Sequence, residues 1–282
     1  PGDENRTPGG NKETEKMPML SLRDIDLHYQ ITGEGDPILF IHGLGSSGRD
    51  WAPQVAVFCK THQTITFDVR GHGRSDKPPG PYSVPLFAAD TTALMQSLGF
   101  GPAHLVGLSM GGMIAFQRSI DAPELVRSMT IVNSGPELIL RGWKQRLLWF
   151  QRQSVVRLLG MRKMGEMLGG RLFPEQAQNE LRERFVERWA ENDKRAYYQA
   201  MQGLVGWSVA EHLGNIQCPT LFIAADQDYT PVSLKQHYVE QMPNATLKLI
   251  HESRHFTSAD QPARFNQALV DFLTGPAGSR PV

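Results

Sequence analysis

The stretch Val106-Gly107-Leu108-Ser109-Met110-Gly111-Gly112 most constrains what this chain can fold into. An apolar segment ends here in Gly-x-Ser-x-Gly, and residues with helical spacing follow, which predicts a sharp strand-to-helix turn. Such a turn exposes the serine hydroxyl at the carboxyl edge of a sheet, and a Cβ at Gly107 or Gly111 would clash with neighbouring chain. The pattern alone also fits a glycine-rich loop with an incidental serine. Residues elsewhere in the chain are needed to distinguish the two interpretations.

Apolar strand-like and amphipathic helix-like segments alternate along most of the chain. Two short strands are expected within residues 20–30. Because short links join the alternating segments, the pattern predicts the α/β class, with a mostly parallel central sheet and helices on both faces. The other expected strands are 38–41, 64–69, 104–108, 126–132, 220–224 and 246–250, and the expected helices are 51–59, 86–98, 110–120, 232–241 and 262–273.

A long stretch between residues 138 and 213 interrupts this alternation with helical periodicity and few strand signals. Strand and helix signals resume after it, so we interpret it as a helical insertion between two strands of one sheet. The expected organisation is a core of residues 19–135 and 214–275, a helical cap at 136–213, a flexible leader at 1–18 and a tail at 276–282.

The composition argues against several classes of protein. The 282 residues include 29 basic and 29 acidic side chains, so no net charge would recruit nucleic acid. The histidines and the two cysteines, Cys59 and Cys218, lack metal-ligand spacing, and free thiols are expected. No apolar run approaches the roughly 18 residues of a membrane span, and the polar first residues carry no secretory signal, which favours a cytoplasmic protein. The oligomeric state stays open.

The loop from Gly43 to Gly48 supports a competing interpretation. Its Gly-x-Gly-x-x-Gly pattern follows a strand and precedes a helix, and Asp68 stands at the next strand end, as in dinucleotide-binding folds. This would make the protein a nicotinamide- or flavin-dependent oxidoreductase. However, the strand before such a loop normally comes first in that fold, and here strand-like segments precede it. The interpretation also leaves the polar residues at three later strand ends unexplained.

Later strand ends carry the groups that an activated serine needs. A serine nucleophile requires a general base and a buried carboxylate that orients the base. Asp226 and Asp228 follow the strand expected at 220–224, and His251 and His255 follow the strand expected at 246–250. The resulting chain order of serine, acid and histidine is the one associated with this type of turn.

Several segments together resemble the α/β-hydrolase superfamily over residues 19–274. The chain looks most like its small capped serine esterases and lactonases, which include arylesterases and 3-oxoadipate enol-lactonases. The resemblance implies an α/β-hydrolase fold with an inserted helical cap, a small-molecule ester substrate and no cofactor. The segments that carry it are His42-Gly43-Leu44-Gly45, Asp68-Val69-Arg70-Gly71-His72-Gly73-Arg74-Ser75, Gly107-Leu108-Ser109-Met110-Gly111-Gly112, Asp226-Gln227-Asp228-Tyr229-Thr230-Pro231 and Arg254-His255-Phe256.

Ser109 is the predicted nucleophile. Ser134 also ends a strand but lacks the flanking glycines. The backbone N–H of Met110 is expected to contribute to an oxyanion hole, and the resemblance implies that the N–H of Leu44 contributes the second donor.

His255 is the predicted base, although the related proteins usually have glycine where this chain has Arg254. Asp228 is the predicted acid, because the family places its acid shortly before a proline and Pro231 follows here. The alternatives are His251 for the base and Asp226 or Glu137 for the acid. His42 and Asp68 are expected to shape the loops around the site through hydrogen bonds.

Residues 138–165 contain seven basic side chains and no acidic one. We expect a cap helix with its apolar face over the active site and its basic face in water, and a membrane-surface helix is the alternative. Trp143, Trp149 and Trp207 are the candidate pocket residues.

The sequence thus predicts a cofactor-independent serine esterase that forms an acyl-enzyme on a small or medium carboxylic ester. A lactone substrate, or peracid formation from an acid and peroxide, would use the same residues. No metal site is expected.

Overall fold

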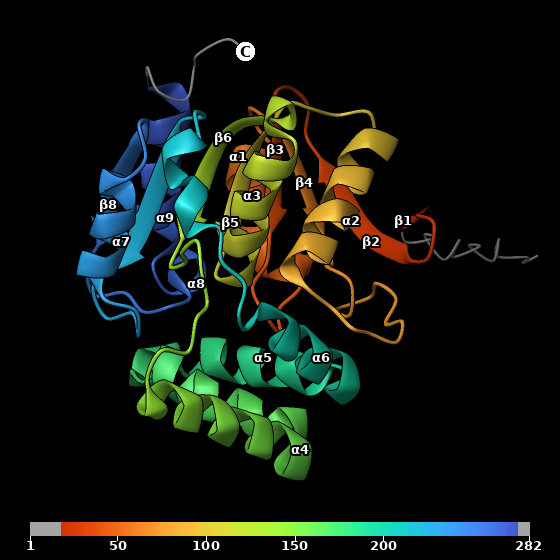
Figure 1. Cartoon of the computed structure of the whole chain (residues 1–282), viewed down its shortest axis with the longest axis vertical. Helices are drawn as coiled ribbons and strands as arrows, with labels where there is room; N and C mark the ends of the chain where they lie inside the picture. Colours follow the sequence, from red (N-terminus) through yellow and green to blue (C-terminus); the bar gives the residue numbers. More distant parts are fainter. Residues whose placement is uncertain (1–17, 276–282) are drawn as a thin grey trace, which may run out of the picture.

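The computed structural model describes residues 18–275, and these form one eight-stranded sheet flanked by helices (Figure 1). The strand order is β1-β2-β4-β3-β5-β6-β7-β8. β2 pairs antiparallel with β1 and β4, and all later neighbours are parallel, so the predicted mostly parallel sheet is confirmed. The strands are β1 (Met19–Ser21), β2 (Asp26–Thr32), β3 (Pro37–Ile41), β4 (Gln63–Phe67), β5 (Ala103–Leu108), β6 (Val126–Val132), β7 (Thr220–Ala225) and β8 (Ala245–Ile250).

The expected leader, apart from residue 18, and the expected tail lie outside the described residues. Cys59 and Cys218 are free thiols, as predicted, and both are half-buried. Among residues 18–275, no helix is long and apolar enough to cross a membrane.

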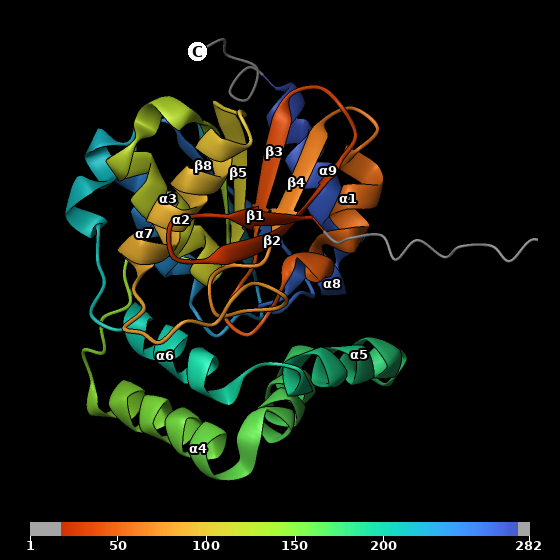
Figure 2. The same cartoon turned by 90° about the vertical axis from the view of Figure 1, so that its right-hand side faces the viewer.

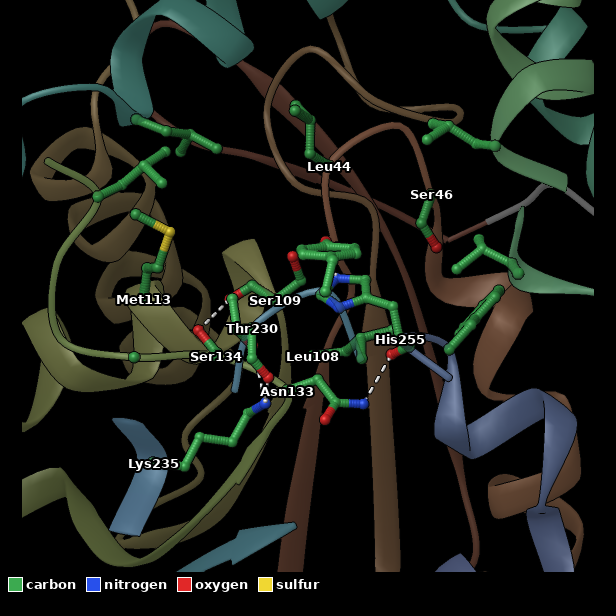
Figure 3. A pocket seen from close by; sticks show the side chains of 18 of the residues that line it. Leu44, Ser46, Leu108, Ser109, Met113, Asn133, Ser134, Thr230, Lys235 and His255 are labelled. Carbon is green, nitrogen blue, oxygen red and sulfur yellow. Dashed lines mark hydrogen bonds between the residues drawn. The ribbon is translucent and has the colours of Figure 1, made fainter. Parts of the chain in front are cut away.

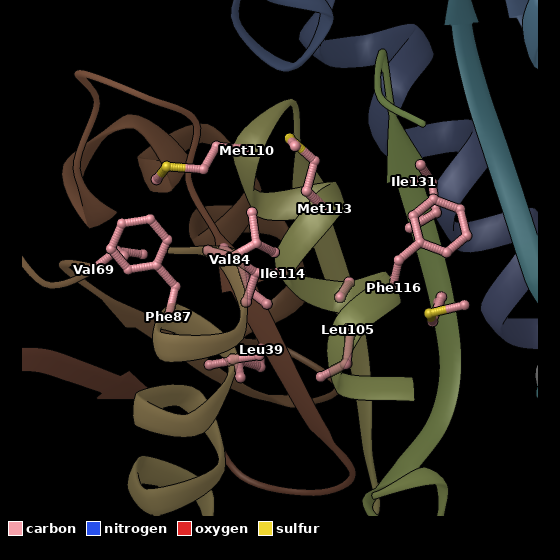
Figure 4. Close-up of a cluster of buried hydrophobic side chains, with 14 of the residues drawn as sticks. Leu39, Val69, Val84, Phe87, Leu105, Met110, Met113, Ile114, Phe116 and Ile131 are labelled. Atoms are coloured by element: carbon pink, nitrogen blue, oxygen red, sulfur yellow. The ribbon is translucent and has the colours of Figure 1, made fainter. Parts of the chain in front are cut away.

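Helices cover both faces of the sheet (Figure 2). On β3, Leu39 and Ile41 pack into the cluster beneath α2 and α3 (Figure 4), whereas Ile38 and Phe40 pack into the cluster beneath α1 and α9. All four side chains are fully buried, which explains why this strand is a continuous apolar run. One face carries α1 (Ala52–Phe58), α8 (Thr257–Asp260) and α9 (Pro262–Thr274), and the other carries α2 (Val84–Ser97), α3 (Met110–Asp121) and α7 (Val232–Glu240).

After β6 the chain leaves the sheet, forms three helices and rejoins the sheet at β7. They are α4 (Trp143–Leu172), α5 (Asn179–Ala190) and α6 (Lys194–Leu204), and they account for the helical periodicity of residues 138–213. Figures 1 and 2 show them together at one end of the sheet. α4 bends at Gly160, whose φ of 82° and ψ of −176° are not helical.

The expected division of α4 into an inner apolar face and an outer basic face is wrong. Trp143 is 71% exposed and Leu158 is 80% exposed, whereas Val156 is fully buried. Trp143 and Leu147 are exposed because residues four apart lie on the same side of a helix, and this side of α4 is turned away from the sheet. The large apolar side chains exposed on α4 are Trp143, Leu147, Leu148, Phe150, Leu158, Leu159 and Met167.

The strand-to-helix turn at Ser109 is held by close backbone approaches. A Cβ on Gly107 would lie 2.3 Å from the carbonyl oxygen of Gly111, and a Cβ on Gly111 would lie 2.0 Å from that of Ile41. Real Cβ atoms do not approach so closely, so the predicted clash is confirmed. These glycines let β3, β5 and α3 meet where a side chain would force them apart.

Gly111→Ala is therefore expected to lower the free energy of unfolding by about 3 kcal/mol, the upper range for overpacking, because the obstacle is backbone that cannot rotate away. Gly170→Ala is the matched control, since a Cβ there has nothing within 4 Å and lies in a helix. It should stabilise the protein by about 0.5–1 kcal/mol. Urea unfolding of both variants measures the difference, and equal stabilities would contradict this account of the turn.

Candidate active site

A cavity of about 240 Å³ lies between the strand ends and the inserted helices (Figure 3). Ser109 and His255, which are far apart in the sequence, both line it. The site is therefore a concave, largely apolar pocket with a few polar groups, as is usual for small-molecule sites. Its apolar lining includes Leu108, Met113, Trp149, Leu172, Phe185 and Trp189.

Ser109 joins β5 to α3 in a conformation that is rare for a residue with a side chain. Its φ is 54° and its ψ is −115°, which costs on the order of 1–3 kcal/mol. The surrounding chain holds it there, because its N–H donates to the Val132 carbonyl over 2.9 Å and its carbonyl accepts from the Ser134 hydroxyl over 2.6 Å. Ser134, the alternative nucleophile, thus supports the turn.

His255 and Asp228 form a directly hydrogen-bonded pair. The imidazole Nδ1 lies 2.8 Å from Oδ1 of Asp228, whose side chain is fully buried. A carboxylate can only accept, so this bond assigns the hydrogen to Nδ1 and leaves Nε2 as an acceptor. A histidine held in that tautomer, with Nε2 turned to a cavity, has the arrangement that a general base requires.

Asp228 has a second partner, a lysine, that was not expected from the sequence. Its Oδ2 accepts from Nζ of Lys235 over 2.7 Å, and the lysine side chain is 2% exposed. Burial alone would raise the pKa of Asp228, but His255 and Lys235 outweigh it and hold that pKa well below its usual range. The carboxylate is therefore ionised and fixed in position. The only sequence signal for Lys235 was its place two turns beyond Asp228, at the start of a predicted helix.

Tyr229 was also missed as a site residue. Its ring stacks on the imidazole of His255 with centroids 4.1 Å apart, and its hydroxyl donates to Nε2. Tyr229 and Ser109 line the same cavity. Tyr229 thus occupies the acceptor through which His255 would deprotonate the serine, and this contact must open before that transfer.

Asn133, directly after β6, connects the loop that carries His255 to the end of β7. Its Nδ2 donates to the carbonyls of Arg254 and His255 over 3.2 and 2.9 Å, and to Oγ1 of Thr257 over 2.8 Å. Its Oδ1 accepts from the N–H of Ala225 over 2.9 Å. One buried amide therefore positions the histidine loop against the end of β7.

Of the two predicted oxyanion donors, Met110 directly follows Ser109, and Leu44 follows Gly43, where a Cβ would lie 3.5 Å from that of Ser109. Met110 is the first residue of α3, so its N–H has no acceptor within the helix. The N–H of Leu44 has no hydrogen-bond partner among the described residues, and Leu44 lines the cavity. Both groups are thus free to donate to a ligand.

The alternative acids and base hold loops or pair elsewhere. Asp226 accepts from the N–H groups of Glu252 and Ser253 over 3.1 and 3.2 Å, while His251 is largely exposed beside it. Glu137 lines the cavity but is paired with both guanidinium nitrogens of Arg141, at 2.6 and 2.8 Å. Between residues 18 and 275, no cluster of His, Cys, Asp and Glu could hold a metal ion.

The loop from Gly43 to Gly48 is tied to Asp68 inside the protein. Asp68 accepts from the N–H of Gly48 over 2.7 Å and from that of Arg74 over 2.8 Å, and it is 2% exposed. Burial alone would raise the pKa of Asp68, but these donors and nearby histidines lower it to about 2. A carboxylate so enclosed cannot reach a ribose, which removes the main support for the dinucleotide interpretation.

His42 shapes the same loop, as expected. It lies within hydrogen-bond distance of the Gly43 carbonyl through Nδ1, at 2.8 Å, and accepts from the Val69 N–H through Nε2, at 2.9 Å.

Of the three candidate pocket tryptophans, only Trp149 lines the cavity. Trp143 lies six residues earlier on α4, which turns its side chain to the exposed side. The indole N–H of Trp207 donates to Oε1 of Gln117 over 2.8 Å, and its ring packs into the core cluster beneath α3. The expectations for Trp143 and Trp207 are therefore corrected.

The fold and the candidate site can be compared with those of known proteins. The model of the α/β-hydrolase fold family matches residues 36–262. The chain therefore belongs to the α/β-hydrolase fold family, as the sequence predicted.

Individual relatives match nearly the whole chain. RutD of Azorhizobium caulinodans, assigned as a carbamate hydrolase, is 31% identical over 267 residues, which are 91% of this chain and 98% of that protein. The 3-oxoadipate enol-lactonase 2 of Acinetobacter baylyi is 28% identical over 256 residues, covering 89% and 94%. The crystal structure of the enol-lactonase from Burkholderia xenovorans LB400 gives a TM-score of 0.84 at 23% identity and covers 92% of this chain and 100% of that one.

Lys235→Met should lower the free energy of unfolding by about 3 kcal/mol, because it leaves the buried Asp228 carboxylate without its permanent cation. Arg162→Met is the control, since that arginine pairs with Glu187 where both side chains are more than half exposed and should contribute less than about 1 kcal/mol. Chemical denaturation measures both. A loss no larger than that of the control would show that Lys235 does not stabilise Asp228.

Tyr229→Phe should keep or raise the turnover of p-nitrophenyl butyrate, because it removes the hydroxyl that competes for Nε2 of His255. Steady-state kinetics provide the measurement, with thermal unfolding as a check on folding. A loss of tenfold or more in a folded variant would contradict competition and make the hydroxyl part of the proton transfer.

Proposed function

We propose that this protein is a serine hydrolase that cleaves small to medium carboxylic esters through an acyl-enzyme. The observation that carries the proposal is the His255–Asp228 pair, because His255 and Ser109 line the same cavity. Ser109, His255 and Asp228 would be nucleophile, base and acid. The hydrolase names of the relatives support a hydrolytic reaction.

The reaction would begin when the Tyr229 hydroxyl leaves Nε2. Ser109 Oγ attacks the ester carbonyl carbon, and its proton passes to Nε2 of His255. Negative charge develops on the carbonyl oxygen, and the N–H groups of Leu44 and Met110 donate hydrogen bonds to it. These bonds stabilise the transition state by several kcal/mol, on the order of 3 per donor. His255 then protonates the departing alcohol.

Water would complete the cycle. His255 removes a proton from a water molecule, whose oxygen attacks the acyl carbon, and the carboxylic acid leaves as Ser109 regains its proton. Asp228, ionised throughout, stabilises the imidazolium that forms in each half. A lactone is a cyclic ester and would follow the same steps, with its alcohol remaining on the released acid.

We further propose that residues 136–213 act as a cap that selects the substrate. α4 and α5 contribute Trp149, Leu172, Phe185 and Trp189 to the cavity lining, while Ser109 and His255 come from the sheet side. Chemistry and selectivity would then reside in different parts of the chain.

Ser109→Ala should reduce kcat for p-nitrophenyl butyrate on the order of 10⁶-fold, because the variant has no nucleophile. Ser134→Ala tests the other serine beside the turn and should lose no more than about tenfold. Release of p-nitrophenolate measures both. Unchanged activity in the Ser109 variant would remove the proposed mechanism.

Asp228→Asn should reduce kcat on the order of 10⁴-fold, since an amide cannot hold His255 in the required tautomer or stabilise its cation. Asp226→Asn makes the same chemical change two residues earlier, where the carboxylate accepts loop N–H groups and lies beside the exposed His251, and it should change kcat little. If Asp226→Asn proves to be the damaging substitution, the acid is assigned wrongly.

A further inference from the structure

Arg152 was expected on the solvent side of the cap, and the role that we infer for it rests on the proposed function. Arg152 lies on α4 three residues after Trp149, so both side chains lie on the same side of the helix. Both line the cavity that holds Ser109 and His255. A guanidinium therefore reaches the proposed reaction chamber.

A buried tyrosine holds the guanidinium of Arg152 by hydrogen bonds. Nε and Nη2 of Arg152 donate to the hydroxyl of Tyr197 over 2.9 and 2.6 Å. Tyr197 is fully buried, and its ring meets that of Trp189 edge to face with centroids 5.4 Å apart. Burial raises the pKa of Tyr197, so the phenol stays neutral and orients Arg152 without cancelling its charge.

The other charged residues that line the cavity have partners of opposite charge. Glu137 is paired with Arg141 and Lys235 with Asp228, while Nδ1 of His255 donates a hydrogen bond to Asp228. No carboxylate among the described residues lies within ion-pair distance of Arg152. Placing a cation in a mostly apolar cavity costs free energy unless an anion pairs with it. We therefore expect the ligand to supply the missing negative charge.

We propose that the substrate is an ester or lactone that carries a carboxylate, and that Arg152 binds this carboxylate while Ser109 attacks the ester carbonyl. A guanidinium offers parallel N–H donors that match a carboxylate, and Arg152 keeps Nη1 free for this purpose. A single cation balances one carboxylate and would leave a phosphate dianion half paired. The carboxylate group, not the length of an apolar chain, would therefore dominate selectivity.

The test compares an anionic ester with a neutral ester of the same shape. The anionic substrate is mono-p-nitrophenyl adipate, whose chain is long enough that its carboxylate does not readily attack its own ester. The neutral one is the p-nitrophenyl ester of the equally long acid that ends in an isopropyl group. A second pair, the butyrates of p-hydroxybenzoate and p-cresol, places the carboxylate on the alcohol side.

Wild-type enzyme should prefer the anionic member of at least one pair in kcat/KM. Arg152→Met should reduce that anionic-to-neutral ratio on the order of 100-fold, because a charged hydrogen bond is lost in a desolvated site. Arg152→Lys should restore part of it. Arg157→Met, on the same helix but exposed, is the matched control and should leave the ratio unchanged.

The outcomes separate this inference from the proposed function. If Ser109→Ala abolishes hydrolysis but Arg152→Met leaves both ratios unchanged, the carboxylate site is overturned and the esterase stands. If neither substrate of either pair is hydrolysed, or if hydrolysis survives Ser109→Ala, the proposed function itself fails. Because the readout is a ratio within each variant, partial misfolding of Arg152→Met cancels from it.

Discussion

The structure depends on the close approach of three backbone segments around Ser109. β3, β5 and α3 come together at Gly107 and Gly111, where no Cβ can fit. This contact forces Ser109 into a strained conformation that places its side chain beside the cavity rather than in the helix. The buried strands on either side are packed on both faces, and they hold the strain that an isolated turn would release.

A second constraint is the buried charge at Asp228. The carboxylate binds His255 on one oxygen and Lys235 on the other, so its position is set from two sides. Asn133 fixes the backbone of His255 from the neighbouring strand end. Orientation of the imidazole therefore comes from elements that are distant in sequence but adjacent in the sheet.

Much of the fold and of the candidate site could be predicted from the sequence. Strand-helix alternation and apolar runs predicted the sheet, because burial on both faces leaves a strong pattern. The glycines around Ser109 and the polar residues after β7 and β8 indicated that Ser109, Asp228 and His255 lie at one edge of the sheet, since parallel strands bring their carboxyl ends together there. These signals are local, and each can be read within a few residues.

Contacts that depend on side-chain direction could not be read in the same way. Tyr229 follows Asp228 directly and Lys235 follows it by two turns, yet nothing in the sequence indicated that Lys235 is buried against Asp228 and that Tyr229 stacks on His255. Trp143 and Arg152 were each placed on the wrong side of α4, because hydrophobicity was assumed to face inward. The observed helix turns a cation toward the cavity and several apolar side chains toward solvent.

The spacing along α4 has a consequence for how such a protein can diverge. Trp149 and Arg152 lie on successive turns of α4 and line the cavity, away from the backbone contacts that build the turn at Ser109. Under the proposed function, substitutions at these two positions would alter which substrates enter the cavity and would leave the turn at Ser109 and the position of His255 unchanged. New substrate ranges would then require only a few changes on one helix.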